Sequence, residues 1–85
     1  MKILFIDDDV CFLQIIEHFA RELKGFDILL CSRVEEGIRL WREGKPDVVV
    51  IDNCLMEMEA QDVISLVGDH KTKIYILSAI FGKTF

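Results

Sequence analysis

The chain has 85 residues, of which 52% are hydrophobic and 29% are charged, with one proline and a formal net charge of −5. This length allows one small domain, and the apolar composition excludes an intrinsically disordered segment. The acidic balance argues against direct nucleic-acid binding. No apolar run approaches the roughly 18 residues that a membrane span needs, so we expect a soluble protein with no membrane contact and no signal peptide.

Three cysteines, Cys11, Cys31 and Cys54, are odd in number and form no CxxC pair. This usage favours neither a disulfide framework nor a zinc site, and a reducing cytoplasm fits it best. We expect Cys11 and Cys31 to be small core residues.

The first expected elements are a strand and an amphipathic helix. Lys2–Ile6 reads as the strand, and Asp7, Asp8 and Asp9 can cap the helix that follows. At 100° per residue the apolar side chains of that helix fall in an arc of roughly 160°, and we expect the helix to end at Gly25. The arc contains Phe12, Leu13, Ile15, Ile16, Phe19, Ala20 and Leu23.

The middle of the chain predicts a second strand, Phe26–Cys31, and a second helix. That helix runs from about Val34 to Gly44 and presents Trp41 at the edge of the core. A turn at Lys45, Pro46 and Asp47 separates it from the next strand.

The third strand, Val48–Ile51, is β-branched throughout, as expected of a central strand covered on both faces, and it leads into Asp52. A helix over Ala60–Gly68 and a fourth strand, Ile74–Leu77, follow, and Ser78 comes directly after the strand. This alternation of strands and helices predicts β-α-β units and a parallel sheet.

Three of the four expected strands end in groups suited to a phosphate and a metal ion. Asp7 and Asp8 follow the first strand, Asp52 the third and Ser78 the fourth. Ligands of open parallel sheets bind outside the carboxyl ends of the strands, so these groups should meet. Three carboxylates brought together repel unless one is protonated or a cation neutralises them, and their oxygen ligands favour Mg²⁺. Asp52 is then a plausible nucleophile toward a phosphoryl group.

At this point the sequence resembles the response-regulator receiver family. The matching pieces are the opening KILFIDD, the PDVVVID run into Asp52, the pair Val63 and Ile64, and IYILSA ending at Ser78 and Ala79. The resemblance implies a flavodoxin-like open parallel α/β sheet of strand order 2-1-3-4 with helices on both faces. It also implies a single domain over residues 1–85 that lacks the family's last strand and final helices.

The resemblance implies a role for each site residue. Asp52 would be the phosphoacceptor, and Ser78 would donate a hydrogen bond to the phosphoryl group. Mg²⁺ would be bound by Asp8, Asp52 and the backbone carbonyl of Cys54, with Asp7 acting through a bound water. The implied partner is a histidine kinase or a phosphotransfer protein, and the chain would perform no catalysis beyond taking and losing the phosphoryl group.

The chain also departs from the family. Met56 and Ala60 stand where the family usually has proline and glycine, and the chain stops at Phe85, before the strand that supplies the family's phosphate-pairing lysine. Lys83 lies in the wrong part of the fold to replace that lysine. These departures keep open a pseudo-receiver, in which the fold serves as a protein-interaction or dimerisation module without phosphorylation.

A third reading is an aspartate-nucleophile phosphatase of the haloacid-dehalogenase kind. Such an enzyme needs a second aspartate two residues after the nucleophile as its acid. Cys54 stands at that position, so the leaving group would have no acid, and this hypothesis is disfavoured.

The resemblance finally predicts an open surface. Without a fifth strand, Ile74–Leu77 is an edge strand, and the tail adds Ile80, Phe81 and Phe85. We therefore expect a homo-oligomer, most simply a dimer, that forms through this edge and tail.

Overall fold

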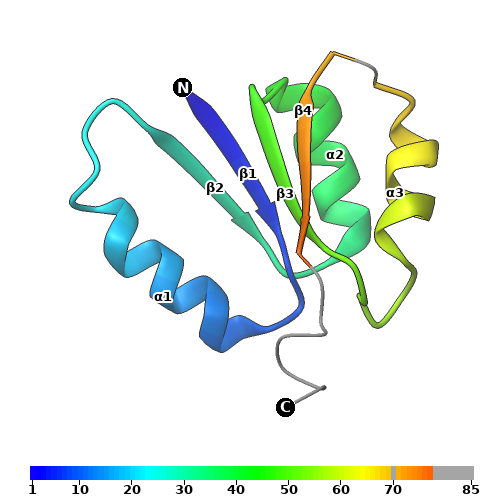
Figure 1. Ribbon diagram of the computed structural model, residues 1–85, viewed down its shortest axis with the longest axis horizontal. Coiled ribbons are helices and arrows are strands. Elements are labelled where there is room, and N and C mark those ends of the chain that lie inside the picture. Colours follow the sequence, from blue (N-terminus) through cyan, green and yellow to red (C-terminus); the bar gives the residue numbers. More distant parts are fainter. Residues whose placement is uncertain (70, 78–85) are drawn as a thin grey trace.

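The computed structural model describes residues 1–69 and 71–77. Strands and helices alternate along the whole described chain (Figure 1). They are β1 (Lys2–Ile6), α1 (Val10–Ala20), β2 (Asp27–Cys31), α2 (Val34–Gly44), β3 (Val48–Asp52), α3 (Ala60–Val67) and β4 (Lys73–Leu77).

The four strands form one parallel sheet of order β2-β1-β3-β4, as the sequence predicts. β1 and β3 are its central strands, with Leu4 opposite Val49 and Ile6 opposite Ile51. All strands run the same way, so their carboxyl ends lie at one edge of the sheet. β1 and β3 end next to each other at that edge, and the loops that follow lead away toward α1 and α3 (Figure 1).

One face of the sheet holds the core. Leu4, Ile6, Val49 and Ile51 have no exposed surface and pack with buried residues of α2 and α3. Burying each of these aliphatic side chains contributes about 1.5–3 kcal/mol. α2 lies so close to β1 that a Cβ added at Gly37 would come within 2.9 Å of Ile6 Cδ1. Helix packing at this position therefore depends on a residue without a side chain.

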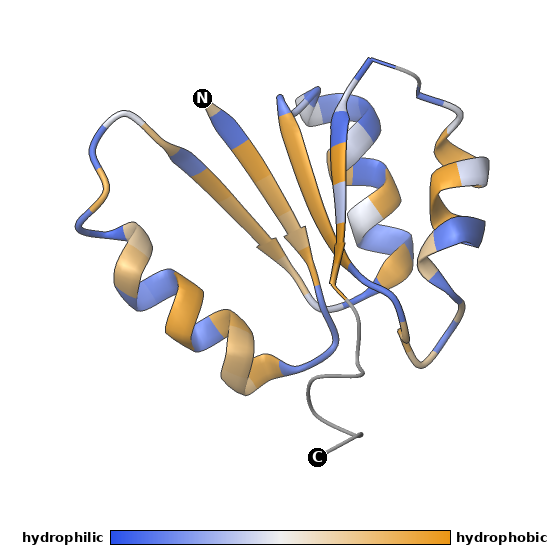
Figure 2. Ribbon diagram, in the orientation of Figure 1, coloured by the Kyte–Doolittle hydropathy of each residue, from blue (hydrophilic) through white to orange (hydrophobic). Residues whose placement is uncertain are grey.

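The opposite face is covered less completely. α1 lies against β2 and is separated from α2 and α3, which lie next to each other across the sheet (Figure 1). Leu13 of α1 is buried, but Ile15 is 53% exposed and Phe19 57% exposed. Apolar residues occupy much of each strand, and apolar and polar residues alternate along α1 (Figure 2). Part of the predicted apolar arc of α1 therefore faces outward.

Two boundaries differ from the sequence prediction. α1 ends at Ala20 rather than at Gly25, because a tight turn closes it: the Leu23 amide donates to the Ala20 carbonyl at 3.2 Å. α2 ends at Gly44 as predicted, but the left-handed residue that terminates it is Lys45, with φ 46°. Cys31 is buried as expected, whereas Cys11 is exposed, so the prediction of a core position for Cys11 is wrong.

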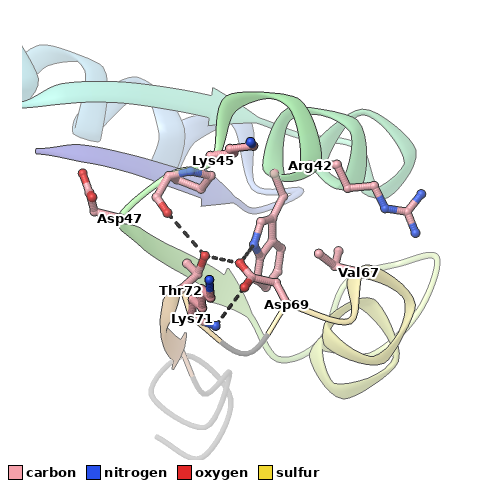
Figure 3. Close-up of a pocket in the computed structure, with 9 residues that line it drawn as sticks. Arg42, Lys45, Asp47, Val67, Asp69, Lys71 and Thr72 are labelled. Atoms are coloured by element: carbon pink, nitrogen blue, oxygen red, sulfur yellow. Dashed lines mark hydrogen bonds between the residues drawn. The ribbon is translucent and has the colours of Figure 1, made fainter.

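Trp41 is 1% exposed and belongs to the core cluster, and it also lines a pocket at the surface. Its indole Nε1 donates to Asp69 Oδ2 at 3.0 Å. Asp69 also accepts hydrogen bonds from the Lys71 amide, at 2.8 Å, and from the Thr72 hydroxyl (Figure 3). These residues line a pocket beside the amino ends of β3 and β4, away from the carboxyl edge of the sheet. The Asp69 carboxylate thus ties the loop before β4 to the buried indole.

Stability should depend on pH through Asp69. The Thr72 hydroxyl, the Lys71 amide and the Trp41 indole hold the pKa of the Asp69 carboxyl well below its ordinary value of 3.8. A carboxyl whose pKa is lower in the folded state than in the unfolded state stabilises the fold when the pH is above the unfolded-state pKa. This stabilisation is lost as the pH falls from the unfolded-state pKa toward the folded-state pKa. We expect the melting temperature of the parent to be higher than that of Asp69→Asn above about pH 5. This difference in melting temperature should shrink below about pH 3. A difference that stays constant over this range would contradict the assignment.

Candidate functional site

Three carboxylates meet at the carboxyl edge of the sheet. Asp7 and Asp8 follow β1, and Asp52 ends β3. One oxygen atom of each carboxylate lies within 4.8 Å of the other two. The structure therefore brings together the three acids that the sequence analysis selected, and we refer to Asp7, Asp8 and Asp52 as the acidic cluster.

Asp7 is the most enclosed member of the acidic cluster, at 7% exposed. Its backbone amide donates to the Cys31 carbonyl at 2.9 Å, and its Oδ1 accepts the Asp9 amide at 2.9 Å. Burial raises the pKa of the Asp7 carboxyl, and the negative charges of Asp52, Asp8 and Asp9 raise it further, against the lowering effect of the Asp9 amide. The acidic cluster is thus a place where negative charge is costly and a cation would be favoured.

Asp8 and Asp52 are partly buried and accept backbone amides of the loop that follows β3. Asp8 Oδ2 accepts the Met56 amide at 2.9 Å, and Asp52 Oδ1 accepts the Cys54 amide at a weaker 3.4 Å. Asp9 has a different role, because its Oδ1 accepts the Phe12 amide at 3.2 Å and caps α1.

The loop over residues 53–59 is held by a bridge between its two ends and by a hydrogen bond to α2. Cys54 and Glu59 form an antiparallel bridge, which closes the loop on itself. The Val34 amide donates to Glu57 Oε1 at 3.2 Å, so the loop caps the amino end of α2. Within the described residues the N-cap of α2, Arg33, makes no side-chain capping bond of its own. Glu57 therefore fixes the loop that carries the Cys54 carbonyl and the Met56 amide.

Sequence reasoning missed Glu57 and the Met56 amide. Glu57 caps a helix that begins 23 residues earlier, and local capping patterns carry no signal for such a contact. Ser78, Lys83 and the tail residues Ile80, Phe81 and Phe85, which were expected to join the dimer contact, lie outside the described residues. Among residues 1–69 and 71–77, no helix is long and apolar enough to cross a membrane.

The residues of the acidic cluster fit a hard divalent cation. The cluster offers only carboxylate oxygens, and backbone carbonyls are available from the adjoining loop. Mg²⁺ takes oxygen ligands and is usually held by one or two carboxylates together with water. Softer metals favour thiolate or imidazole ligands, and the cluster contains neither.

Comparison with known proteins identifies a family that resembles this chain over most of its length. The family model described as "Response regulator receiver domain" matches residues 3–83. The chain is 28% identical over 74 residues to the "Uncharacterized transcriptional regulatory protein YcbL" of Bacillus subtilis, covering 87% of this chain and 32% of that protein.

Solved structures show the same fold. The response regulator receiver domain protein from Clostridium thermocellum is 31% identical, with a TM-score of 0.77, over 91% of this chain and 64% of that one. The receiver domain of the Francisella response regulator 1452 is 26% identical, with a TM-score of 0.79, over 98% of this chain and 69% of that one. The chain spans about a third of the length of the curated relative YcbL.

Proposed function

Because the chain belongs to the response regulator receiver family of two-component systems, we propose that Asp52 accepts a phosphoryl group from a histidine kinase or a phosphotransfer protein. The observation that supports this proposal most strongly is the position of Asp52, at the end of a central strand and within 4.8 Å of Asp7 and Asp8. A carboxylate so placed is a nucleophile that needs only an aligned donor and charge neutralisation.

In the proposed reaction a carboxylate oxygen of Asp52 attacks the phosphorus of a phosphohistidine. The phosphorus–nitrogen bond of the donor breaks, and its electron pair leaves on the imidazole ring. The product is an acyl phosphate on Asp52, which water later hydrolyses. In this proposal the chain is a substrate of its kinase rather than an enzyme, and it works in the cytoplasm.

Mg²⁺ is the proposed cofactor. Asp8, Asp52 and the backbone carbonyl of Cys54 would bind it, and Asp7 would act through a bound water. When bound, Mg²⁺ would offset the negative charge of the phosphoryl oxygens and of the acidic cluster. Ser78 is proposed to donate a hydrogen bond to the phosphoryl group.

The experiment that tests the proposal is intact-mass analysis after incubation with acetyl phosphate and Mg²⁺. We expect the protein to gain the mass of one phosphoryl group. If no mass is gained with acetyl phosphate or with a phosphorylated donor protein, the alternative of a non-phosphorylated interaction module is favoured instead.

The acidic cluster predicts an unusual response to Asp8→Asn. Removing one of three carboxylates that lie within 4.8 Å of one another should stabilise the cation-free protein, because their negative charges repel. The same change should abolish the rise in melting temperature that Mg²⁺ produces by binding the folded state. Thermal melts with and without Mg²⁺ check both effects. A lower cation-free melting temperature together with a surviving Mg²⁺ effect would place the site elsewhere.

We also propose that the chain forms a homodimer through β4. Tyr75, Ile76 and Leu77 of this strand are 50%, 46% and 38% exposed. β4 pairs with β3 on one side, and no other described strand pairs with it. An apolar strand that is paired on only one side among residues 1–69 and 71–77 favours pairing with a second copy.

A further inference from the structure

We propose that the Met56 backbone amide is a positioning group for the acidic cluster: it holds Asp8, compensates part of the cluster's charge without a cation, and thereby weakens cation binding. The inference rests on the cation site proposed above. It starts from the hydrogen bond that Met56 N–H donates to Asp8 Oδ2 at 2.9 Å. The Met56 side chain is 91% exposed, so the residue acts on Asp8 through its backbone alone.

The charge balance explains the direction of the effect. A hydrogen bond from an amide to a carboxylate stabilises the ionised carboxylate and draws electron density toward the donor. In the cation-free protein this bond offsets part of the repulsion among three carboxylates that lie within 4.8 Å of one another. A cation that binds Asp8 must share the carboxylate with this donor or displace it. The amide therefore stabilises the cation-free form more than the cation-bound form.

The loop holds the amide toward Asp8 from both sides. Leu55, on one side, is only 9% exposed and belongs to the core cluster. On the other side Glu57 bonds the Val34 amide, and Met58 packs against the core. With its neighbours anchored, the Met56 amide is fixed in position while its side chain projects into solvent. Any residue with a backbone N–H could serve at this position, but proline could not, because proline has no N–H.

The test compares Met56→Pro with Met56→Ala. Both remove the exposed side chain, but only Met56→Pro removes the amide hydrogen. Loss of one charge-assisted hydrogen bond near the surface should tighten the binding of Mg²⁺ or Mn²⁺ by about 3- to 10-fold. Met56→Ala should bind the cation like the parent. Cation affinity is measured by calorimetry or, for Mn²⁺, by electron paramagnetic resonance. Met56→Pro should also lower the melting temperature of the cation-free protein, whereas Met56→Ala should not.

A second variant separates the hydrogen bond from backbone strain, because proline also restricts Leu55. Replacing the peptide bond between Leu55 and Met56 with an ester removes the Met56 N–H and leaves the side chain unchanged. The chain of 85 residues can be assembled by ligation at Cys54. The ester should reproduce the tighter cation binding and the lower cation-free stability. An ester protein that matches the parent in both measurements would overturn the inference, as would weaker cation binding.

The two proposals fail in different ways. If the parent and all variants bind neither Mg²⁺ nor Mn²⁺, the proposed cation site fails, and with it the effect on cation affinity. The melting temperature then decides whether the amide acts on Asp8. An ester that lowers the melting temperature of the parent but not that of Asp8→Ala supports the inference. An equal decrease in both proteins overturns it. Slow exchange of the Met56 amide with solvent deuterium, accelerated by Asp8→Ala, is expected; fast exchange in the parent would also overturn it.

Discussion

Asp52→Asn is expected to lose all phosphoryl incorporation from acetyl phosphate while keeping its fold. Asp52 lies beside Asp7 and Asp8 at the carboxyl end of β3, and the amide of asparagine cannot form the acyl phosphate. The matched control is Asp62→Asn, which makes the same change of charge at an exposed position of α3. The control should be modified like the parent. Intact-mass analysis of the three proteins under identical conditions measures the effect.

Incorporation that survives in Asp52→Asn would show that another side chain takes the phosphoryl group. Loss of incorporation in both variants would point instead to a general effect of charge. The circular dichroism spectrum of Asp52→Asn should match that of the parent, because Asp52 is only partly buried and makes one weak hydrogen bond, to the Cys54 amide at 3.4 Å.

The second large effect is expected for Ile76→Lys, which should convert the proposed dimer to a monomer. Ile76 is 46% exposed in β4, and a lysine there would place a charge in the centre of an apolar strand-to-strand contact. Charged side chains on edge strands are a common device against such pairing. We expect the dissociation constant of the dimer to rise by at least about tenfold, which corresponds to roughly 1.4 kcal/mol.

Light scattering and the concentration dependence of the melting temperature measure this change. The parent should melt at a lower temperature on dilution, and Ile76→Lys should melt at one temperature at all concentrations. Gln61→Lys, the same gain of charge at an exposed position of α3, should behave like the parent. A parent that is monomeric at micromolar concentration, with a melting temperature independent of dilution, would disprove the dimer.

The order of the elements could be predicted because local signals coincide with the fold. Val48–Ile51 is a short β-branched run followed by an aspartate, and the structure makes it a central strand that ends at Asp52. Asp7, Asp8 and Asp52 could be selected as a group because parallel strands release their carboxyl ends at one edge. Periodicity also described α1 correctly as amphipathic, but it could not show that Ile15 and Phe19 stay exposed.

Contacts between segments that are distant in the sequence could not be predicted from it. Trp41 was expected to anchor the core, but its hydrogen bond to Asp69, 28 residues away, could not be predicted. Glu57 caps α2 from the loop after β3, and the Met56 amide reaches Asp8 across 48 residues. None of these pairs follows a local pattern, because each depends on how the loops fold back over the sheet.

Identifying the residue that carries the phosphoryl group tests most directly whether Asp52 is the phosphoacceptor. Reduction of the phosphorylated protein with borohydride converts an aspartyl phosphate to homoserine, and peptide mass mapping then finds the modified residue. We expect homoserine at position 52 alone, formed only when Mg²⁺ is present during phosphorylation. Homoserine at another aspartate, or modification that is unaffected when Mg²⁺ is removed with a chelator, would contradict this expectation.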